Sequence, residues 1–144
     1  MAFLAGEMLT AARANRQQSR TYSAIGSGTI PASSTNVDVT GATVTFTTET
    51  AGASFKAWCV WDFNSLGASA ASSTGRLVVD GVNQLPLVVF RGDAAADRGT
   101  QAQNYVGTLG AAGSHTLKLI TSTSTNTECL GSNTSITVEI AEVV

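Results

Sequence analysis

Charged residues are scarce in this chain of 144 residues: they make up 12% of the sequence, and the formal net charge is -2. The bases do not gather into a cluster, because only three arginines fall in the first 20 residues and five bases are spread over the rest. Binding to nucleic acid depends on a concentrated basic face that neutralises phosphates. The composition therefore argues against a nucleic-acid partner.

Histidine occurs once, as His115, and no Cys-x-x-Cys, His-x-x-x-His or Asp-rich calcium loop is present. These gaps argue against a metal centre and indicate no cofactor. A hydrolase would have to combine His115 with Ser114 and an aspartate, whereas a histidine within a strand or turn explains the residue equally well. We expect no catalytic residue and a chain that is not an enzyme.

The two cysteines, Cys59 and Cys129, allow one disulfide, and two buried thiols are the alternative.

The sequence also lacks an apolar run near the roughly 20 residues of a membrane-spanning helix. The opening residues do not fit a secretion signal, because Glu7 interrupts the apolar run and Arg13 stands at the would-be cleavage site. We therefore expect no membrane insertion.

What the sequence does contain is short apolar or alternating runs separated by glycine from Tyr22 onward. Many strands with no helices between them predict an all-β, antiparallel β-sandwich of about eight or nine strands, jelly-roll-like, with a closed barrel as the alternative. Residues 22–144 are expected to form this domain. The strands are expected near residues 22–30, 36–40, 43–49, 54–63, 76–80, 84–90, 101–109, 115–122 and 134–143.

The segment 55–63 shows the clearest alternation, with Phe, Ala, Cys, Trp and Phe at its odd positions. These five side chains are expected to face the core, and Lys56 and Asp62 to face outward. Trp58 and Val60 then lie on the outer face, which predicts that another segment or subunit covers it. Asp80-Gly81 predicts a tight hairpin between its flanking strands.

The N-terminal stretch 1–21 is expected to form a short helix or extended arm, with Thr10 as its cap. Its apolar residues would form an exposed hook, which favours docking onto another protein. The predicted docking residues are Phe3, Leu4, Met8, Leu9, Arg13 and Arg16.

Two further sets of side chains have competing interpretations. Asp93 and Asp97 resemble the carboxylate pair of a glycosidase, but they lie in a polar connection where solvated charges are usual. The aromatic residues of 55–63 are interpreted mainly as core. Trp58 and Tyr105 are the candidates for a glycan or subunit contact.

The stretch from Phe3 to Asn15 resembles the opening of minor tail proteins of tailed bacteriophages, through Gly6, Leu9, Thr10, Ala11 and Asn15. The body is similar to jelly-roll-like domains of phage tails and capsids. The segments that carry this second resemblance are 54–63, 75–82, 101–109 and 113–119.

The resemblance implies a structural protein of the virion, either a minor tail protein or a capsid decoration or head-fibre protein. Its N-terminal segment would dock on other virion proteins, and the sandwich would be displayed as a homo-oligomer, expected to be a trimer. The alternative is a carbohydrate-binding adhesin or receptor-binding module whose partner is a glycan on the host surface.

Overall fold

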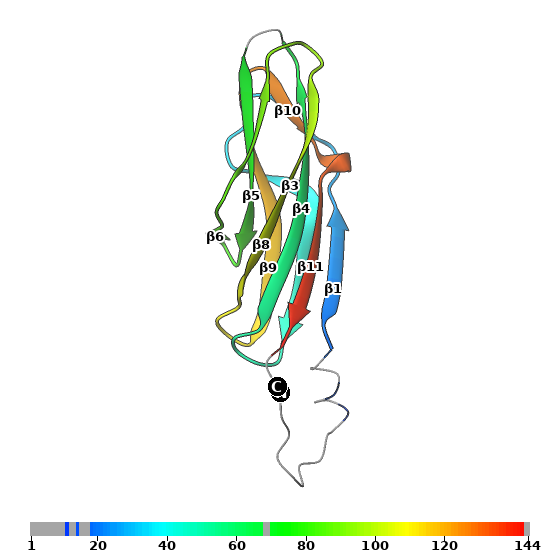
Figure 1. Ribbon diagram of the computed structural model, residues 1–144, viewed down its shortest axis with the longest axis vertical. Coiled ribbons are helices and arrows are strands. Elements are labelled where there is room, and N and C mark those ends of the chain that lie inside the picture. The colour runs from blue at the N-terminus through cyan, green and yellow to red at the C-terminus, as the bar shows by residue number, and fades with distance from the viewer. Residues whose placement is uncertain (1–10, 12–13, 15–17, 68–69, 143–144) are drawn as a thin grey trace.

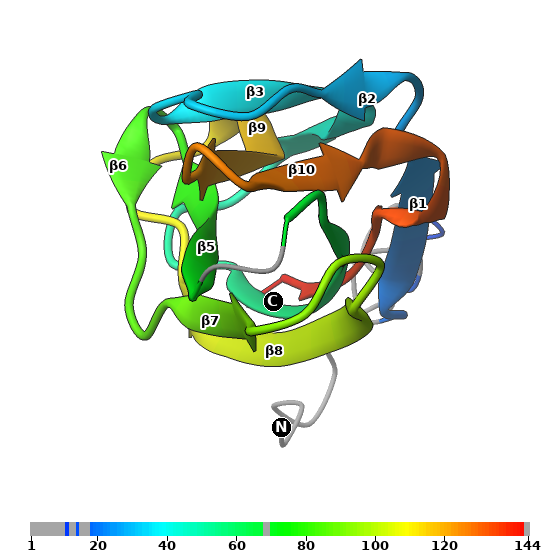
Figure 2. The same cartoon turned by 90° about the horizontal axis from the view of Figure 1, so that it is seen from above.

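The structure is a computed structural model that describes residues 11, 14, 18–67 and 70–142. It is an elongated all-β sandwich of two antiparallel sheets, which Figures 1 and 2 show along and across its length. Eight strands are long: β1 (Arg20–Ile25), β3 (Val37–Thr48), β4 (Ser54–Ser65), β5 (Ala71–Val79), β7 (Val88–Gly92), β8 (Arg98–Thr108), β9 (Gly113–Thr123) and β11 (Ser135–Ala141). Three are short: β2 (Thr29–Ile30), β6 (Val82–Asn83) and β10 (Thr127–Leu130), and a 3-10 turn, η1 (Gly131–Asn133), follows β10.

The strand order is that of a jelly roll. One sheet contains β1-β11-β4-β8 and the other β3-β9-β5-β7. Among the eight long strands, the first therefore pairs with the eighth, the second with the seventh, the third with the sixth and the fourth with the fifth. This nesting confirms the jelly-roll-like sandwich expected from the sequence.

The core lies between the sheets and follows the predicted alternation of β4. Its odd positions from Phe55 to Phe63 are all buried. Trp61 fills the centre, where its indole Nε1 donates a hydrogen bond of 3.2 Å to the carbonyl of Ile120. Gly75 allows this arrangement, because a Cβ at that position would lie 2.6 Å from the Trp61 ring.

The Asp80-Gly81 hairpin is present between β5 and β6, with Val79 opposite Val82. Both turn residues have positive φ, 48° and 83°, as a primed turn requires. The strand expected over 84–90 is wrong in its extent, because β6 ends at Asn83 and β7 begins only at Val88.

Other boundaries also differ from the prediction. The two strands expected at 36–40 and 43–49 are one strand, β3, whose register shifts between Asp38 and Thr43. β1 begins at Arg20, inside the expected arm. The predicted docking residues Phe3, Leu4, Met8, Leu9, Arg13 and Arg16 lie outside the described residues.

Candidate binding face and structural sites

The outer face of the β1-β11-β4-β8 sheet contains Trp58, a predicted contact residue that is exposed. The strand register arranges it in rows across the four strands. We call it the Trp58 face. Its three complete rows are Thr21-Glu139-Lys56-Val106, Ser23-Thr137-Trp58-Asn104 and Ile25-Ser135-Val60-Ala102.

This face is nearly neutral in charge. Its three rows contain two charged residues, Lys56 and Glu139, which are cross-strand neighbours of opposite sign. In the middle row, the hydroxyls of Ser23 and Thr137 lie 3.0 Å apart within hydrogen-bond distance. The two outer rows include the exposed apolar side chains of Val106 and Ile25, so the face combines polar and apolar groups.

Trp58 stands in the middle row with 41% of its surface exposed, flanked by Thr137 and Asn104. A tryptophan with one free face and hydrogen-bonding neighbours can stack on an apolar ring or fill a pocket of a partner protein. The cover expected for this face, the N-terminal segment or a neighbouring subunit, lies outside the described residues.

Tyr105, the other candidate for a glycan or subunit contact, does not belong to this face. The prediction is wrong for this residue, because its side chain is buried. Its ring points to the core and is 4% exposed, and its hydroxyl donates a hydrogen bond of 2.7 Å to the carbonyl of Pro86. Burial raises the pKa of this phenol. Tyr105 therefore fixes the segment between β6 and β7 against β8.

Asp62 points to the outer side, as predicted, yet it is buried. Arg98 of β8 covers it and donates through Nε to both carboxylate oxygens at 3.1 Å. The hydrogen bonds and charge of Asp62 raise the pKa of Arg98. This bidentate pair closes the Trp58 face at the end of the sheet near η1.

Cys59 and Cys129 are free thiols in the structure. Cys129 of β10 stands opposite Phe63, four residues further along β4 than Cys59, a separation of about 13 Å of strand. A disulfide needs Cα atoms within roughly 7 Å. Burial raises the pKa of Cys59 to about 12 and also raises that of Cys129, so both act as small core residues.

His115 is buried and held on both ring nitrogens. Nδ1 lies 2.7 Å from the Asp80 carboxylate, and Nε2 lies 3.1 Å from the Ala111 carbonyl and 3.2 Å from the Thr48 hydroxyl. The carboxylate of Asp80 and the carbonyl of Ala111 can only accept hydrogen bonds, whereas the Thr48 hydroxyl can donate or accept. The side chains of Thr48, His115 and Asp80 therefore match a catalytic triad in distance, but Nε2 is shared with a main-chain carbonyl.

Ser114 does not join His115, since neighbouring residues of a strand point to opposite faces, and Ser114 is exposed. Asp80 instead serves the β5–β6 turn. Partial burial works to raise its pKa, but the hydrogen bonds from His115 and from the Thr116 amide, at 2.8 Å, bring it below its ordinary value. His115 thus connects the β5–β6 turn, the β8–β9 connection and the end of β3.

Asp93 and Asp97 lie in the β7–β8 connection. The Asp97 carboxylate accepts hydrogen bonds of 3.0 Å from the amides of Ala94 and Asp93, and these bonds lower its pKa. Asp97 thus shapes the turn. The arrangement supports the interpretation of these residues as loop charges.

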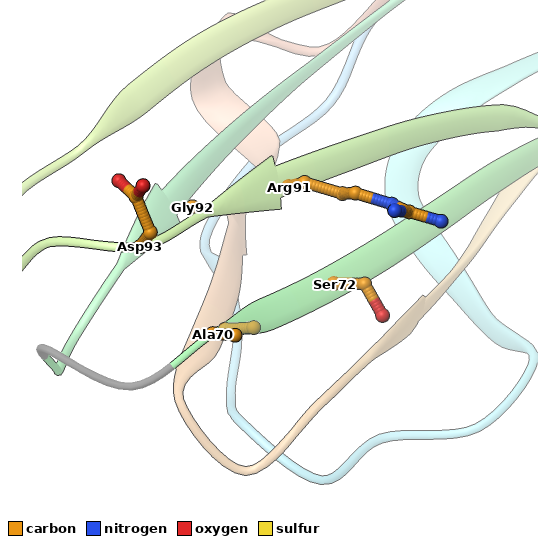
Figure 3. A pocket seen from close by; sticks show the side chains of 6 residues that line it. Ala70, Ser72, Arg91, Gly92 and Asp93 are labelled. Carbon is orange, nitrogen blue, oxygen red and sulfur yellow. The ribbon is translucent and has the colours of Figure 1, made fainter.

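A shallow hollow of about 490 Å³ lies beside this connection, lined by Ala70, Ala71, Ser72, Arg91, Gly92 and Asp93. Figure 3 shows the side chains of Arg91 and Asp93 extending in opposite directions. The two opposite charges therefore do not converge on one point of the hollow.

The two ends of the sandwich differ. Arg20 at the start of β1 stands opposite Ile140 near the end of β11, and its guanidinium pairs with the carboxylate of Glu142. Glu142 also accepts hydrogen bonds from the amides of Glu49 and Thr50, at 2.8 and 3.0 Å. The chain thus enters and leaves the sandwich at one end, and the β7–β8 connection lies at the other (Figure 1).

Within the described ranges, no three His, Cys, Asp or Glu side chains gather as metal ligands. Residues 18–67 and 70–142 also include no helix that is long and apolar enough to cross a membrane.

No protein-family model matches the chain, and no curated protein matches it in sequence. Among solved structures, it is similar to dimeric latent PorU from Porphyromonas gingivalis, with a TM-score of 0.49 and 14% identity over 85% of this chain. The match covers 12% of that PorU chain. It is also similar to the CBM36-1 domain of a multidomain xylanase from the hindgut metagenome of Trinervitermes trinervoides, with a TM-score of 0.40, 11% identity, and coverage of 88% and 99% of the two chains.

Proposed function

We propose that the chain is a non-enzymatic structural subunit of a bacteriophage virion, displayed on the tail or capsid surface and held through its N-terminal segment. The observation that carries the proposal is that the first and last strands of the sandwich have their outer ends at the same end of the molecule. Arg20, at the start of β1, is paired there with Glu142, which follows β11. A domain with this arrangement can be attached by one end and present its opposite end and its sheet faces.

The fold supports this role, because jelly rolls are a common architecture of viral shell proteins and of lectins. The arrangement of His115 also supports a role without catalysis, since both ring nitrogens are engaged and the ring is buried. In this proposal, Phe3, Leu4, Met8 and Leu9 supply the apolar contacts to other virion proteins, and Arg13 and Arg16 supply charged contacts.

The experiment is deletion of residues 1–17, which leaves β1 intact from Arg20. The truncated chain should retain its β-type circular dichroism and its cooperative unfolding, yet be absent from purified phage particles that incorporate the full chain. A matched variant with Arg13→Gln and Arg16→Gln removes the two charges and keeps the apolar residues, so it tests the charged contacts separately from the apolar ones. Incorporation of the truncated chain at the wild-type level would contradict the proposed attachment.

A second candidate is glycan binding, and the exposure of Trp58 favours it. An indole flanked by Thr137 and Asn104 offers a stacking surface next to hydrogen-bonding groups, which is the combination that a sugar ring requires. Glycan-array binding that is lost in Trp58→Ala and retained in Trp58→Phe, with both variants folded, would support this role. Absence of glycan binding by the wild type would count against it.

A further inference from the structure

The outer edge of β8 is a long, unpaired strand edge. β8 pairs with β4 on one side, and no other strand of the described chain pairs with it. β7 of the other sheet lies beside β8 without pairing with it (Figure 2). Just beyond its end, Leu109 directs both main-chain groups toward the β4 side: its amide donates to Ala53, and its carbonyl accepts from Gly52. Because these directions alternate along a strand, the even-numbered residues from 100 to 108 direct their amides and carbonyls away from β4.

Little on β8 protects this edge. From Gly99 to Thr108 the strand contains no proline and no charged residue. Arg98, at its start, is engaged with Asp62. One exposed carbonyl has a local partner, because the side-chain amide of Gln103 donates to the carbonyl of Asn104 at 2.8 Å.

The other long edge, β3, does carry protective features. It has a register shift between Asp38 and Thr43, a positive φ at Gly41, and an ion pair between Asp38 and Lys118. Bulges and charges of this kind prevent unwanted pairing of strands. The remaining edges, β1, β2, β6 and β7, are six residues long or shorter. β8 is therefore the edge of the described sandwich best suited to accept a strand.

We propose that β8 pairs with β8 of a second copy, antiparallel, about a two-fold axis at Asn104. In a two-fold symmetric contact, the same strand of both copies pairs in opposite directions. The side chains of β8 must therefore be compatible with those of β8 of the second copy, taken in reverse order. In this register Asn104 faces Asn104 of the second copy, Ala102 faces Val106, and Thr100 faces Thr108. Every pair is uncharged, and the exposed Val106 acquires an apolar neighbour in Ala102.

The pairing would also satisfy the outward main-chain groups from Thr100 to Thr108. Five doubly hydrogen-bonded pairs in an antiparallel ladder correspond to about ten new hydrogen bonds. The two Trp58 faces would then become one continuous sheet surface. This inference does not depend on the role of the N-terminal segment, and a dimer is distinguishable by mass from the trimer that the resemblance implies.

A cysteine placed on the two-fold axis tests the register. Paired residues at a hydrogen-bonded site have Cα atoms about 5.5 Å apart, within the range that a disulfide accepts. Asn104→Cys should give a covalent dimer on oxidation with diamide. The matched control is Ser23→Cys, exposed in the same row but on β1, which should remain monomeric under denaturing electrophoresis.

Light scattering of the full chain tests the interface itself. The wild type should have the mass of a dimer, and Asn104→Lys, which places like charges opposite each other, should weaken dimerisation about fivefold or more. Ser23→Lys should have no effect. A monomeric or trimeric wild type at the highest concentration reached, failure of Asn104→Cys to crosslink, or equal effects of the two lysine variants would overturn the proposal.

Discussion

The two faces of β4 place tryptophans in opposite environments only three residues apart. Trp61 points inward, is fully buried, and is hydrogen-bonded to the carbonyl of Ile120. Trp58 points outward, is 41% exposed, and lies between Thr137 and Asn104 of the neighbouring strands. The same residue type therefore lies in the core on one face and is exposed to solvent on the other, because neighbouring residues of a strand alternate between its two faces.

Replacement of Trp61 should have the largest effect. Trp61→Ala removes a fully buried indole from between the sheets and leaves the carbonyl of Ile120 without its partner. Such truncations cost about 3–5 kcal/mol. Urea unfolding followed by circular dichroism should show this loss, or no folded protein at all. Trp61→Phe, a smaller change, should still cost about 1–3 kcal/mol through the unsatisfied carbonyl. A loss below about 1 kcal/mol in Trp61→Ala would contradict the description of this core.

Gly75→Ala should have the next largest effect, through the same indole. The added Cβ would lie 2.6 Å from the Trp61 ring, so the ring or the strand must move. Overpacking of this kind costs about 1–3 kcal/mol. The control is Gly110→Ala, where a Cβ meets nothing within 4 Å. Thermal unfolding of the two variants should differ clearly, and combining Gly75→Ala with Trp61→Phe should recover part of the loss.

A smaller effect is expected at Asp80, and it depends on pH. Its folded-state pKa lies below the ordinary value of 3.8, so ionised Asp80 stabilises the fold above that value, and this contribution is lost as pH falls through the folded-state pKa. Asn tolerates the positive φ of this turn position, so Asp80→Asn keeps the backbone while removing the charge. At neutral pH the variant should lose less than about 1 kcal/mol, because the pair is partly exposed.

Unfolding free energies at several pH values check this prediction. Between neutral pH and pH 3, the wild type should lose more stability than Asp80→Asn, and the two curves should converge on the acid side. Parallel curves would show that Asp80 has no such coupling to His115 and to the Thr116 amide.

The contrast between the faces of β4 also shows what the sequence could predict. The alternation over 55–63 was sufficient to orient Trp61 and Cys59 inward, because apolar residues occupy every odd position. The sequence does not indicate that Tyr105 is buried, because the inward positions of β8 include Gln101 and Gln103, and their polarity hides the alternation of the strand. The four-residue β10 gives no alternation long enough to detect.

Long-range contacts could not be predicted from the sequence, for a different reason. Asp62 was correctly assigned to the outer face, but its burial depends on Arg98, which follows 36 residues later. Likewise, the hydrogen-bonding of His115 is decided by Asp80 and Ala111 on separate turns. Local patterns orient a side chain relative to its own strand, whereas the topology determines which other segment covers it.

Trp58→Ala should have the smallest effect on stability, and it tests most directly the difference between the two faces of β4. The side chain is partly exposed, so its removal should change the free energy of unfolding by less than about 1 kcal/mol. The same substitution at Trp61 should cost at least three times as much, although both tryptophans lie on one strand. If Trp58→Ala instead destabilises the monomer as strongly as Trp61→Ala, the outer face supports the fold and is not free for recognition. If the stability is unchanged while glycan binding is lost, the exposed indole is a recognition element of this face.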